Sequence, residues 1–243
     1  MAEQRSRLRA RAIVGDETGV GIVMIPIDRS STAGTPFTLY SDPGNAAADP
    51  ACNASGTAVA FALNNNIFKL PTSGRAGPSL VATTASGGPA LEPAWSSDDR
   101  AIAFEDAISP GSSDIETAYA DGRFIAGGRP VTPHEPGLRH GASWRGDKLY
   151  YWKQPDPASP SQGIFSVTLG HPNEVGPYGG TDGSTACRDP AALPDGRGFE
   201  CVGADTFIKV FPGPKTLNDT DASKPDVERI PEGHDRDRWD HHK

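Results

Sequence analysis

A repeat limits the fold of this chain more than any other feature of its sequence. Four segments align with one another without gaps, namely DPACNASGTAVAF (49–61), EPAWSSDDRAIAF (92–104), RHGASWRGDKLYY (139–151) and DPAALPDGRGFEC (189–201). A second element appears five times, as IVMIPI from Ile22, IFKLP from Ile67, IETAYA from Ile115, IFSVTL from Ile164 and IKVFP from Ile208. A period of roughly 45 residues predicts one structural unit used several times rather than a single local motif.

Each unit reads as an antiparallel meander of four short strands. In the second segment, a strand that contains Trp95 is followed by the turn SSDD, the strand AIAF, the alternating run IETAYAD and a short strand near PVT. The 28 Gly and 23 Pro residues fit a chain with many turns. Such a unit is typical of a propeller blade, which buries both faces only against its neighbours. The predicted fold class is therefore all-β, a β-propeller.

The stretch PAWSSDDRAIAF (93–104), followed by a strand that starts at Ile115, resembles the WD-like β-propeller repeats of the TolB family. Units of that family read approximately Pro, any residue, Trp, Ser, Pro, Asp, Gly, two variable residues and Ile-Ala-Phe. Here Asp99 replaces the usual Gly, and Cys52 takes the Trp position of the first segment. In the third segment, His140 aligns with Pro and Ala142 with Trp. The resemblance covers nearly the whole chain and implies the fold, but its motif residues are structural in every copy.

We expect one domain, residues 1–243, that consists of five four-stranded blades. The expected blades are 8–40 together with a C-terminal strand in 234–243, then 49–84, 92–133, 139–180 and 188–231. The C-terminal segment EGHDRDRWDHHK would supply the strand that the first blade lacks, with Trp239 in the place of Trp95, and would close the ring. Two alternatives remain open, a charged tail without a strand and a shortened relative of a six-bladed propeller. TolB itself is usually described with six blades and an extra domain.

Three cysteines bear on the cellular compartment. Cys52 is expected to be a small buried hydrophobic residue. Cys187 and Cys201 flank a hairpin and are expected to face each other across two strands, so either a disulfide or two buried thiols is consistent with the sequence. A disulfide would favour an extracytoplasmic, periplasmic or secreted protein. The N-terminal stretch MAEQRSRLRARAIVGD has no apolar region typical of a secretory signal, so the chain is either cytoplasmic or a mature form whose leader was removed.

The composition limits the partners. A net charge of −8 argues against nucleic acid, which is bound through clustered Lys and Arg. A basic protein or small ligand fits better. No apolar run is long enough to span a membrane. We expect a monomer without a cofactor.

Motifs for catalysis are missing from the sequence. It contains no GxSxG, P-loop, HExxH, CxxC or EF-hand pattern, so no catalytic or metal-ligating residue is assigned. The run DIETAYADGRF lacks the spacing of a calcium loop and is read as a strand with its turn. His234, His241 and His242 near the C-terminus are compatible with a transition metal but are better explained as part of a solvated or strand-forming tail.

One constellation of polar residues stands just before the first strand of each repeat. Its members are Asp49, Glu92, Arg139 with His140, and Asp189, with Asp235 or Asp237 as candidates at the closing blade. In a ring, equivalent positions of successive blades converge at the mouth of the central channel. Carboxylates there are consistent with turn capping, with binding of a cation or basic peptide, or with hydrolysis of a sugar by paired carboxylates.

The fourth blade differs most from the others. It carries Trp144, the aromatic run LYYW (149–152) and the insertion KQPDPASPSQG (153–163). Trp144, Tyr150 and Trp152 are candidates for a protein or carbohydrate contact surface. The alternative is that these aromatic side chains pack in the core between blades.

Two hypotheses for function follow. The first is a binding scaffold, without enzymatic activity, that presents the channel mouth and the loops of the fourth blade to a protein or small ligand. The second is a propeller hydrolase, similar to a glycosidase or peptidase, that uses the carboxylates of the channel mouth. The lack of a recognised nucleophile or metal motif favours the first.

Overall fold

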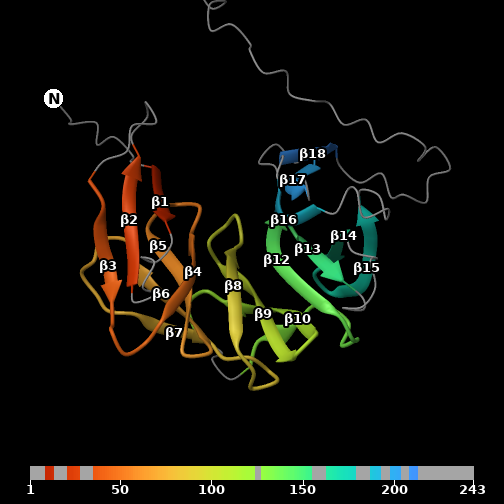
Figure 1. Ribbon diagram of the computed structural model, residues 1–243, viewed down its shortest axis with the longest axis horizontal. Coiled ribbons are helices and arrows are strands. Elements are labelled where there is room, and N and C mark those ends of the chain that lie inside the picture. The colour runs from red at the N-terminus through yellow and green to blue at the C-terminus, as the bar shows by residue number, and fades with distance from the viewer. Residues whose placement is uncertain are drawn as a thin grey trace, which may run out of the picture.

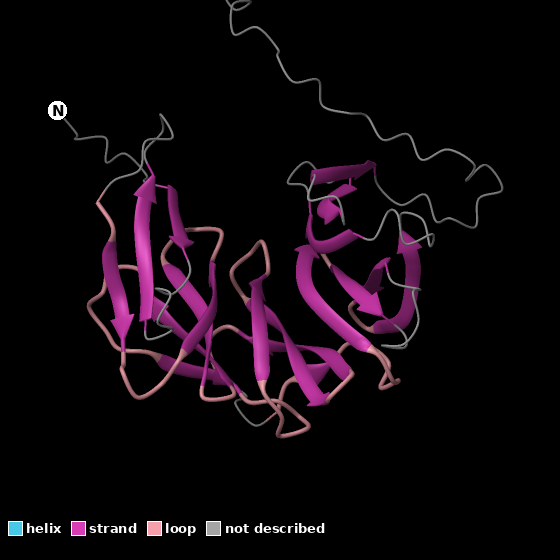
Figure 2. Cartoon of the chain, in the orientation of Figure 1, coloured by secondary structure: helices cyan, strands magenta, loops and turns pink. Residues whose placement is uncertain are grey.

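All described secondary structure in the computed structural model is β-strand (Figure 2). The structure describes residues 9–13, 21–27, 35–123, 127–154, 163–178, 187–192, 198–203 and 208–212. Within these residues the strands form five separate antiparallel sheets. No helix of the described part is long and apolar enough to cross a membrane.

Each sheet follows the chain in sequence order. The first sheet contains β1 (Arg9–Ile13), β2 (Gly21–Ile27) and β3 (Phe37–Ser41). The second contains β4 (Ala47–Cys52), β5 (Ala58–Leu63), β6 (Asn66–Pro71) and β7 (Ser79–Ala82). The third contains β8 (Ala90–Trp95), β9 (Ala101–Ser109), β10 (Ser112–Tyr119) and β11 (Arg129–Pro130). The fourth contains β12 (Leu138–Arg145), β13 (Lys148–Gln154), β14 (Gly163–Thr168) and β15 (His171–Tyr178). The fifth contains β16 (Cys187–Ala192), β17 (Gly198–Gly203) and β18 (Ile208–Pro212).

The five sheets follow one another along an arc, with the first and fifth sheets at its two ends (Figure 1). The first strands of successive sheets are neighbours in space, since β4 contacts β8, β8 contacts β12, and β12 contacts β16. These strands form the inner side of the arc, and we call them the inner strands. Any residue type that recurs on them is therefore brought together by the fold, although the repeats are far apart in the sequence.

The second strand of a sheet is the most deeply buried. In β5, with the sequence AVAFAL, five of the six residues are buried, because the strand packs against neighbouring sheets on both faces. Among the described residues, apolar side chains from adjacent sheets form three separate cores. One, between the second and third sheets, includes Ile67, Ile102 and Phe104, and Trp95 packs against it. Cys52 is half-buried and packs against the core that Phe61 shares with β2, which fits the expected hydrophobic role of this cysteine.

A β-bulge recurs at the same place in the inner strands. The register between the first and second strands shifts between Ala48 and Ala51, between Leu91 and Ala94, between His140 and Ser143, and between Arg188 and Ala191. The first bulged residue has positive φ in three of these sheets, 52° at Asp49, 48° at Glu92 and 61° at Gly141. The equivalent of Asp49 and Glu92 in the fourth sheet is therefore Gly141.

This register corrects the gapless alignment of the third segment. Trp95 pairs with Ile102, seven residues further along, once the turn 96–100 has been made. Trp144 pairs with Leu149, only five residues further along, because the hairpin turns tightly at Gly146. Trp144, and not Ala142, thus occupies the position of Trp95, and His140 is not the equivalent of Pro93. The shorter hairpin explains the error.

Closure of the ring stays a prediction. The first and fifth sheets each contain three strands within the described residues. The C-terminal segment with Trp239, Asp235 and Asp237, which was expected to complete the first blade, lies outside the described residues, as do His234, His241 and His242. The blade boundaries and the number of blades in a closed ring stay predictions for the same reason.

Candidate binding site on the inner strands

The carboxylates at the bulges join one sheet to the next. Asp49 Oδ2 accepts a hydrogen bond from the backbone N–H of Glu92, at 3.3 Å. Glu92 Oε2 in turn accepts one from the backbone N–H of Gly141, at 2.6 Å. The bulge tips this N–H out of its own ladder, so the carboxylate of the preceding sheet satisfies it. Asp49 and Glu92 therefore have an architectural role, in which each accepts a hydrogen bond from the following sheet.

Glu92 is also part of a compact cluster with Glu105 of β9 and His140 of β12. One ligand atom of each residue lies within 4.8 Å of the other two. Glu105 is only 3% exposed, and its Oε2 lies 2.6 Å from His140 Nδ1. The His140 ring stacks on Trp152, with 5.4 Å between ring centroids. These three residues could hold a divalent cation, but Glu105 and His140 already satisfy each other by a hydrogen bond.

Burial and negative charge both act on Glu92. Desolvation raises the pKa of its carboxyl group, the Gly141 N–H lowers it, and the charge of Glu105 raises it again. His140 lowers the pKa, and Asp49 adds a small increase. The net direction is upward, so a cation that approached Glu92 would find a carboxylate whose negative charge is not fully compensated by the protein.

A shallow hollow of about 270 Å³ opens beside these carboxylates. Four inner strands contribute to it, through Asp49, Pro50, Glu92, Pro93, Gly141, Ala142 and Pro190. We call it the inner hollow. Asp49 and Glu92 both line it, and His140 lies beside Glu92. The backbone of Asp189 lies at the fourth bulge, but its side chain lies outside the described residues.

Arg139 does not reach the inner hollow, contrary to expectation. It is fully buried between the third and fourth sheets, where Nη1 lies 3.3 Å from Asp114 Oδ1 and Nε lies 3.1 Å from Glu174 Oε1. Nη1 also donates to the backbone oxygens of Ser113 and Glu135. Because successive residues of a strand point to opposite faces, Arg139 points away from the side of β12 that His140 faces. Its role is to hold two sheets together.

The predicted contact surface of the fourth sheet is also corrected. Tyr150 and Trp152 are 2% and 6% exposed, so they belong to the interior. Trp144 is half-buried, and its Nε1 donates to the backbone oxygen of Ala94, at 2.9 Å. Trp95 makes the same bond to Ala51 in the preceding sheet, at 2.9 Å. Tyr150 and Trp152 are buried because they lie on β13, the second strand of its sheet. Most of the insertion, residues 155–162, lies outside the described residues.

Cys187 and Cys201 do not lie directly opposite each other. The backbone register places Cys187 opposite Gly203 and Cys201 opposite Lys209 of the other neighbouring strand. Ala192 pairs with Phe199, so the register of this hairpin places Cys187 two residues away from the position opposite Cys201. The two side chains lie outside the described residues, so the disulfide stays a prediction, which the mass increase on alkylation with and without reductant would test.

Sequence reasoning missed Glu105. A usable signal existed, since Glu105 and Asp106 continue the apolar strand AIAF and a charged residue within such a strand is rarely buried unless it is paired. Its partner, however, lies in the next sheet, and only the fold identifies it as His140.

Comparison with known proteins identifies the architecture. No family model matches the chain, and no curated protein matches its sequence. Among solved structures, TolB from Agrobacterium tumefaciens is similar, with a TM-score of 0.60 and 20% identity over 82% of this chain and 66% of that one. TolB from Acinetobacter baumannii gives a TM-score of 0.59 and 14% identity over 83% of this chain and 49% of that one. A puromycin-hydrolyzing peptidase from Mycobacterium tuberculosis gives 0.56 and 20%, over 86% of this chain and 36% of that one.

These similarities place the chain among the β-propellers. Its fold is that of a TolB-like propeller, as the repeat predicted. The chain spans from about half to two-thirds of the length of the two TolB structures. At 14–20% identity the similarity concerns the fold alone.

Proposed function

We propose that this chain is a binding propeller without enzymatic activity, and that the inner hollow receives a positively charged group of a protein or small ligand. The observation that supports the proposal most is the charge of the hollow. Asp49 and Glu92 line it, and Glu105 lies within 4.8 Å of Glu92. The buried cation Arg139 is directed away from it, toward Asp114 and Glu174.

A basic partner also fits the chain as a whole. Its net charge is −8, so association with a cationic partner is favoured at long range. Asp49 and Glu92 each use one oxygen to accept an inter-sheet hydrogen bond, which holds the carboxylate in place and leaves its other oxygen available to a ligand. Such a prearranged acceptor reduces the entropy lost on binding.

The test is titration of the protein with the peptide hexalysine at low and at physiological salt. Hexaglutamate, a peptide of the opposite charge, is the control ligand. We expect Glu92→Gln to weaken hexalysine binding about fivefold to tenfold, since a charge-assisted hydrogen bond is worth about 1.5–3 kcal/mol before solvent screening. Asp98→Asn removes one negative charge from an exposed turn and is the matched control. Equal loss in the two variants would mean that only net charge matters and would refute a site at the hollow.

A hydrolase is the second candidate, and one observation favours it. Ligand atoms of Glu92 and Glu105 lie within 4.8 Å, similar to the roughly 5–5.5 Å between the two carboxyl groups of retaining glycosidases. The raised pKa of Glu92 would suit a general acid. Against this, Glu105 is buried and bonded to His140. Release of nitrophenol from a panel of nitrophenyl glycosides, lost in Glu92→Gln, would establish the hydrolase and replace the binding proposal.

We further propose that the protein is monomeric and acts outside the cytoplasm, where a disulfide between Cys187 and Cys201 would persist. Sedimentation at several concentrations tests the first point. The thiol count of protein isolated from its native compartment tests the second.

A further inference from the structure

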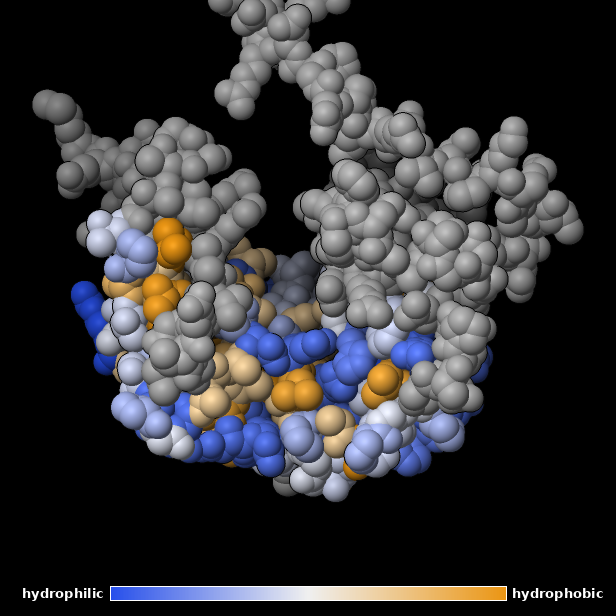
Figure 3. Space-filling model, in the orientation of Figure 1, coloured by the Kyte–Doolittle hydropathy of each residue, from blue (hydrophilic) through white to orange (hydrophobic). Residues whose placement is uncertain are grey.

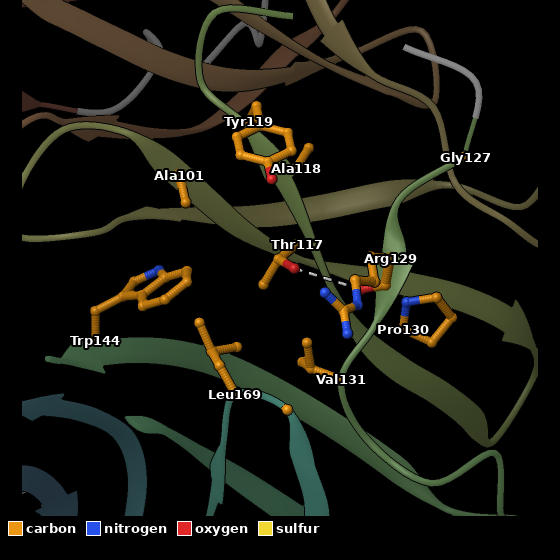
Figure 4. Close-up of a pocket in the computed structure, with 11 residues that line it drawn as sticks. Ala101, Thr117, Ala118, Tyr119, Gly127, Arg129, Pro130, Val131, Trp144 and Leu169 are labelled. Atoms are coloured by element: carbon orange, nitrogen blue, oxygen red, sulfur yellow. Dashed lines mark hydrogen bonds between the residues drawn. The ribbon is translucent and has the colours of Figure 1, made fainter. Parts of the chain in front are cut away.

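A pocket of about 500 Å³ lies between the third and fourth sheets, distinct from the inner hollow. Figure 4 shows Trp144 on one side of it and Arg129 on the other, with Thr117, Leu169 and Val131 between them. We call it the Trp144 pocket. On the face seen in Figure 3, hydrophobic residues of the described surface form only small separate groups among hydrophilic ones. The Trp144 pocket, where several apolar side chains lie beside an arginine, therefore differs in composition from the surface seen in Figure 3.

The corresponding place between the second and third sheets is also a pocket, of about 570 Å³, but a lysine side chain of the protein crosses it. Lys69 pairs with Ala60 in β5, and Thr117 pairs with Ala103 in β9, so the two residues hold the same position in their sheets. Lys69 extends to the next sheet, and its Nζ donates to the backbone oxygen of Ala120. Thr117 is too short to do this, and its hydroxyl donates at 3.5 Å to Arg129 of its own sheet.

The exchange of Lys for Thr removes from the Trp144 pocket the ammonium group that spans the preceding one. Trp95 and Trp144 lie at equivalent positions beside the two sites, and each is held by the same bond to the preceding sheet. The wall is therefore retained while the side chain that crosses the space is lost. A pocket of this size with a rigid aromatic wall is suited to a small molecule.

Among the described residues that line the pocket, Arg129 is the one with a charged side chain. It is exposed, and its guanidinium group forms no ion pair or hydrogen bond with any residue that the structure describes. In Figure 4 the guanidinium group extends from β11 into the pocket beside Thr117. Arg bonds carboxylates in a bidentate geometry that an ammonium group does not provide. Trp144, Leu169 and Val131 supply apolar surface opposite this charge.

We propose that the Trp144 pocket binds a small aromatic carboxylate, with the ring against Trp144 and Leu169 and the carboxylate on Arg129. The charge of the ligand is opposite to that expected at the inner hollow, so the two sites select different molecules. The inference goes beyond the proposed function and does not depend on it.

The test uses two probes of equal size, 3-phenylpropionate and 3-phenylpropan-1-ol, with binding followed by saturation-transfer NMR and calorimetry. We expect the carboxylate to bind at least tenfold more tightly than the alcohol. Arg129→Gln should remove this difference and leave binding of the alcohol unchanged. Arg75→Gln, which removes an exposed arginine outside the pocket, should have no effect on either probe.

A second variant tests the location. Thr117→Met places a longer side chain at a residue that lines the pocket, so it should abolish binding of both probes. Thermal unfolding of each variant establishes that it is folded. Equal affinity for the two probes, or a Thr117→Met protein that binds as well as the parent, would overturn the proposal. Glu92→Gln should leave probe binding unchanged, so this result and the hexalysine result can fail separately.

Discussion

The interface between the second and third sheets differs from the interface between the third and fourth in how each treats buried charge. The first contains an apolar core and a pair of carboxyl groups, Asp106 and Glu116, that are 2% and 1% exposed. They face backbone N–H groups of Ala85 and Ser86. No cation of the described residues forms an ion pair with either. The second interface contains Asp114 and Glu174, and each of these two carboxylates has a cationic partner, Arg139 or Lys153.

The pKa values reflect this difference. Burial, together with the charge of Asp106, raises the pKa of Glu116 to about 7. Burial acts in the same direction on Glu174, but Lys153, Tyr151 and Arg139 together bring its pKa below the usual value. The repeat thus fixes where sheets meet, and the residues at each meeting decide whether a carboxyl group is protonated or paired.

The largest effect is expected from removal of Arg139. Arg139→Met keeps the volume approximately but leaves Asp114 and Glu174 buried without their shared cation, so the free energy of unfolding should fall by about 3–5 kcal/mol. Urea unfolding measures it. Arg129→Met, which removes an exposed arginine without an ion pair among the described residues, is the control and should change stability by less than about 0.5 kcal/mol. Similar losses in both variants would show that the ion pairs at Arg139 contribute nothing specific.

The second prediction concerns pH at the other interface. The pKa of Glu116 in the folded state, about 7, exceeds its usual value of 4.5, so folding favours the protonated form. The free energy of unfolding should therefore fall as pH rises from the usual pKa to the raised one, by up to about 3 kcal/mol. Glu116→Gln mimics the protonated form and can still accept from Ala85, so it should match the parent below the usual pKa of Glu116 and exceed its stability above the raised pKa. Parallel pH profiles of the two proteins would contradict the assignment.

Asp99 provides the third prediction, because its carboxylate crosses from the third sheet to the turn of the second. It accepts hydrogen bonds from Asn53 Nδ2 at 3.0 Å and from the N–H groups of Ala54 and Ser55 at 2.7 and 3.1 Å. Asp99→Asn tolerates the φ of 61° but presents an amide to donors, and should destabilise by about 1–2 kcal/mol. Asp98→Asn, whose Oδ1 bonds only Ser96 and Arg100 of its own turn, should lose less. A larger loss of unfolding free energy for Asp98→Asn than for Asp99→Asn would contradict the role of Asp99 in joining the two sheets.

The repeat predicted the sheets because it depends on local signals. Alternating apolar residues, Gly in turns and the anchor positions recur in each unit, and strand formation follows from them. The acidic positions Asp49 and Glu92 were also predictable, since both stand at the same bulge. The alignment failed at Trp144, because the hairpin that follows it is shorter than in the other repeats. A comparison without gaps therefore assigns the wrong equivalent to each residue of the segment that precedes this hairpin.

The sites between sheets could not be predicted in the same way. Arg139 and His140 are adjacent in the sequence, yet one pairs with Asp114 and the other with Glu105, because successive residues of a strand point to opposite faces. Their partners lie in another repeat, and nothing in the local pattern specifies which repeat. The same holds for Lys69 and Thr117, whose equivalence became clear only from the strand register.

The smallest expected effect tests the feature that the two interfaces share. Trp95→Phe and Trp144→Phe each remove one indole N–H that donates at 2.9 Å to a backbone oxygen of the preceding sheet. Each should cost about 1 kcal/mol, the usual net contribution of such a bond. Equal losses in urea unfolding would mean that the two tryptophans are the same architectural element. The two interfaces would then differ in the residue opposite the tryptophan, Lys69 in one and Thr117 in the other. A much smaller loss for Trp144→Phe would contradict this, since it would show that the bond to Ala94 contributes little and that Trp144 is held mainly by its apolar contacts.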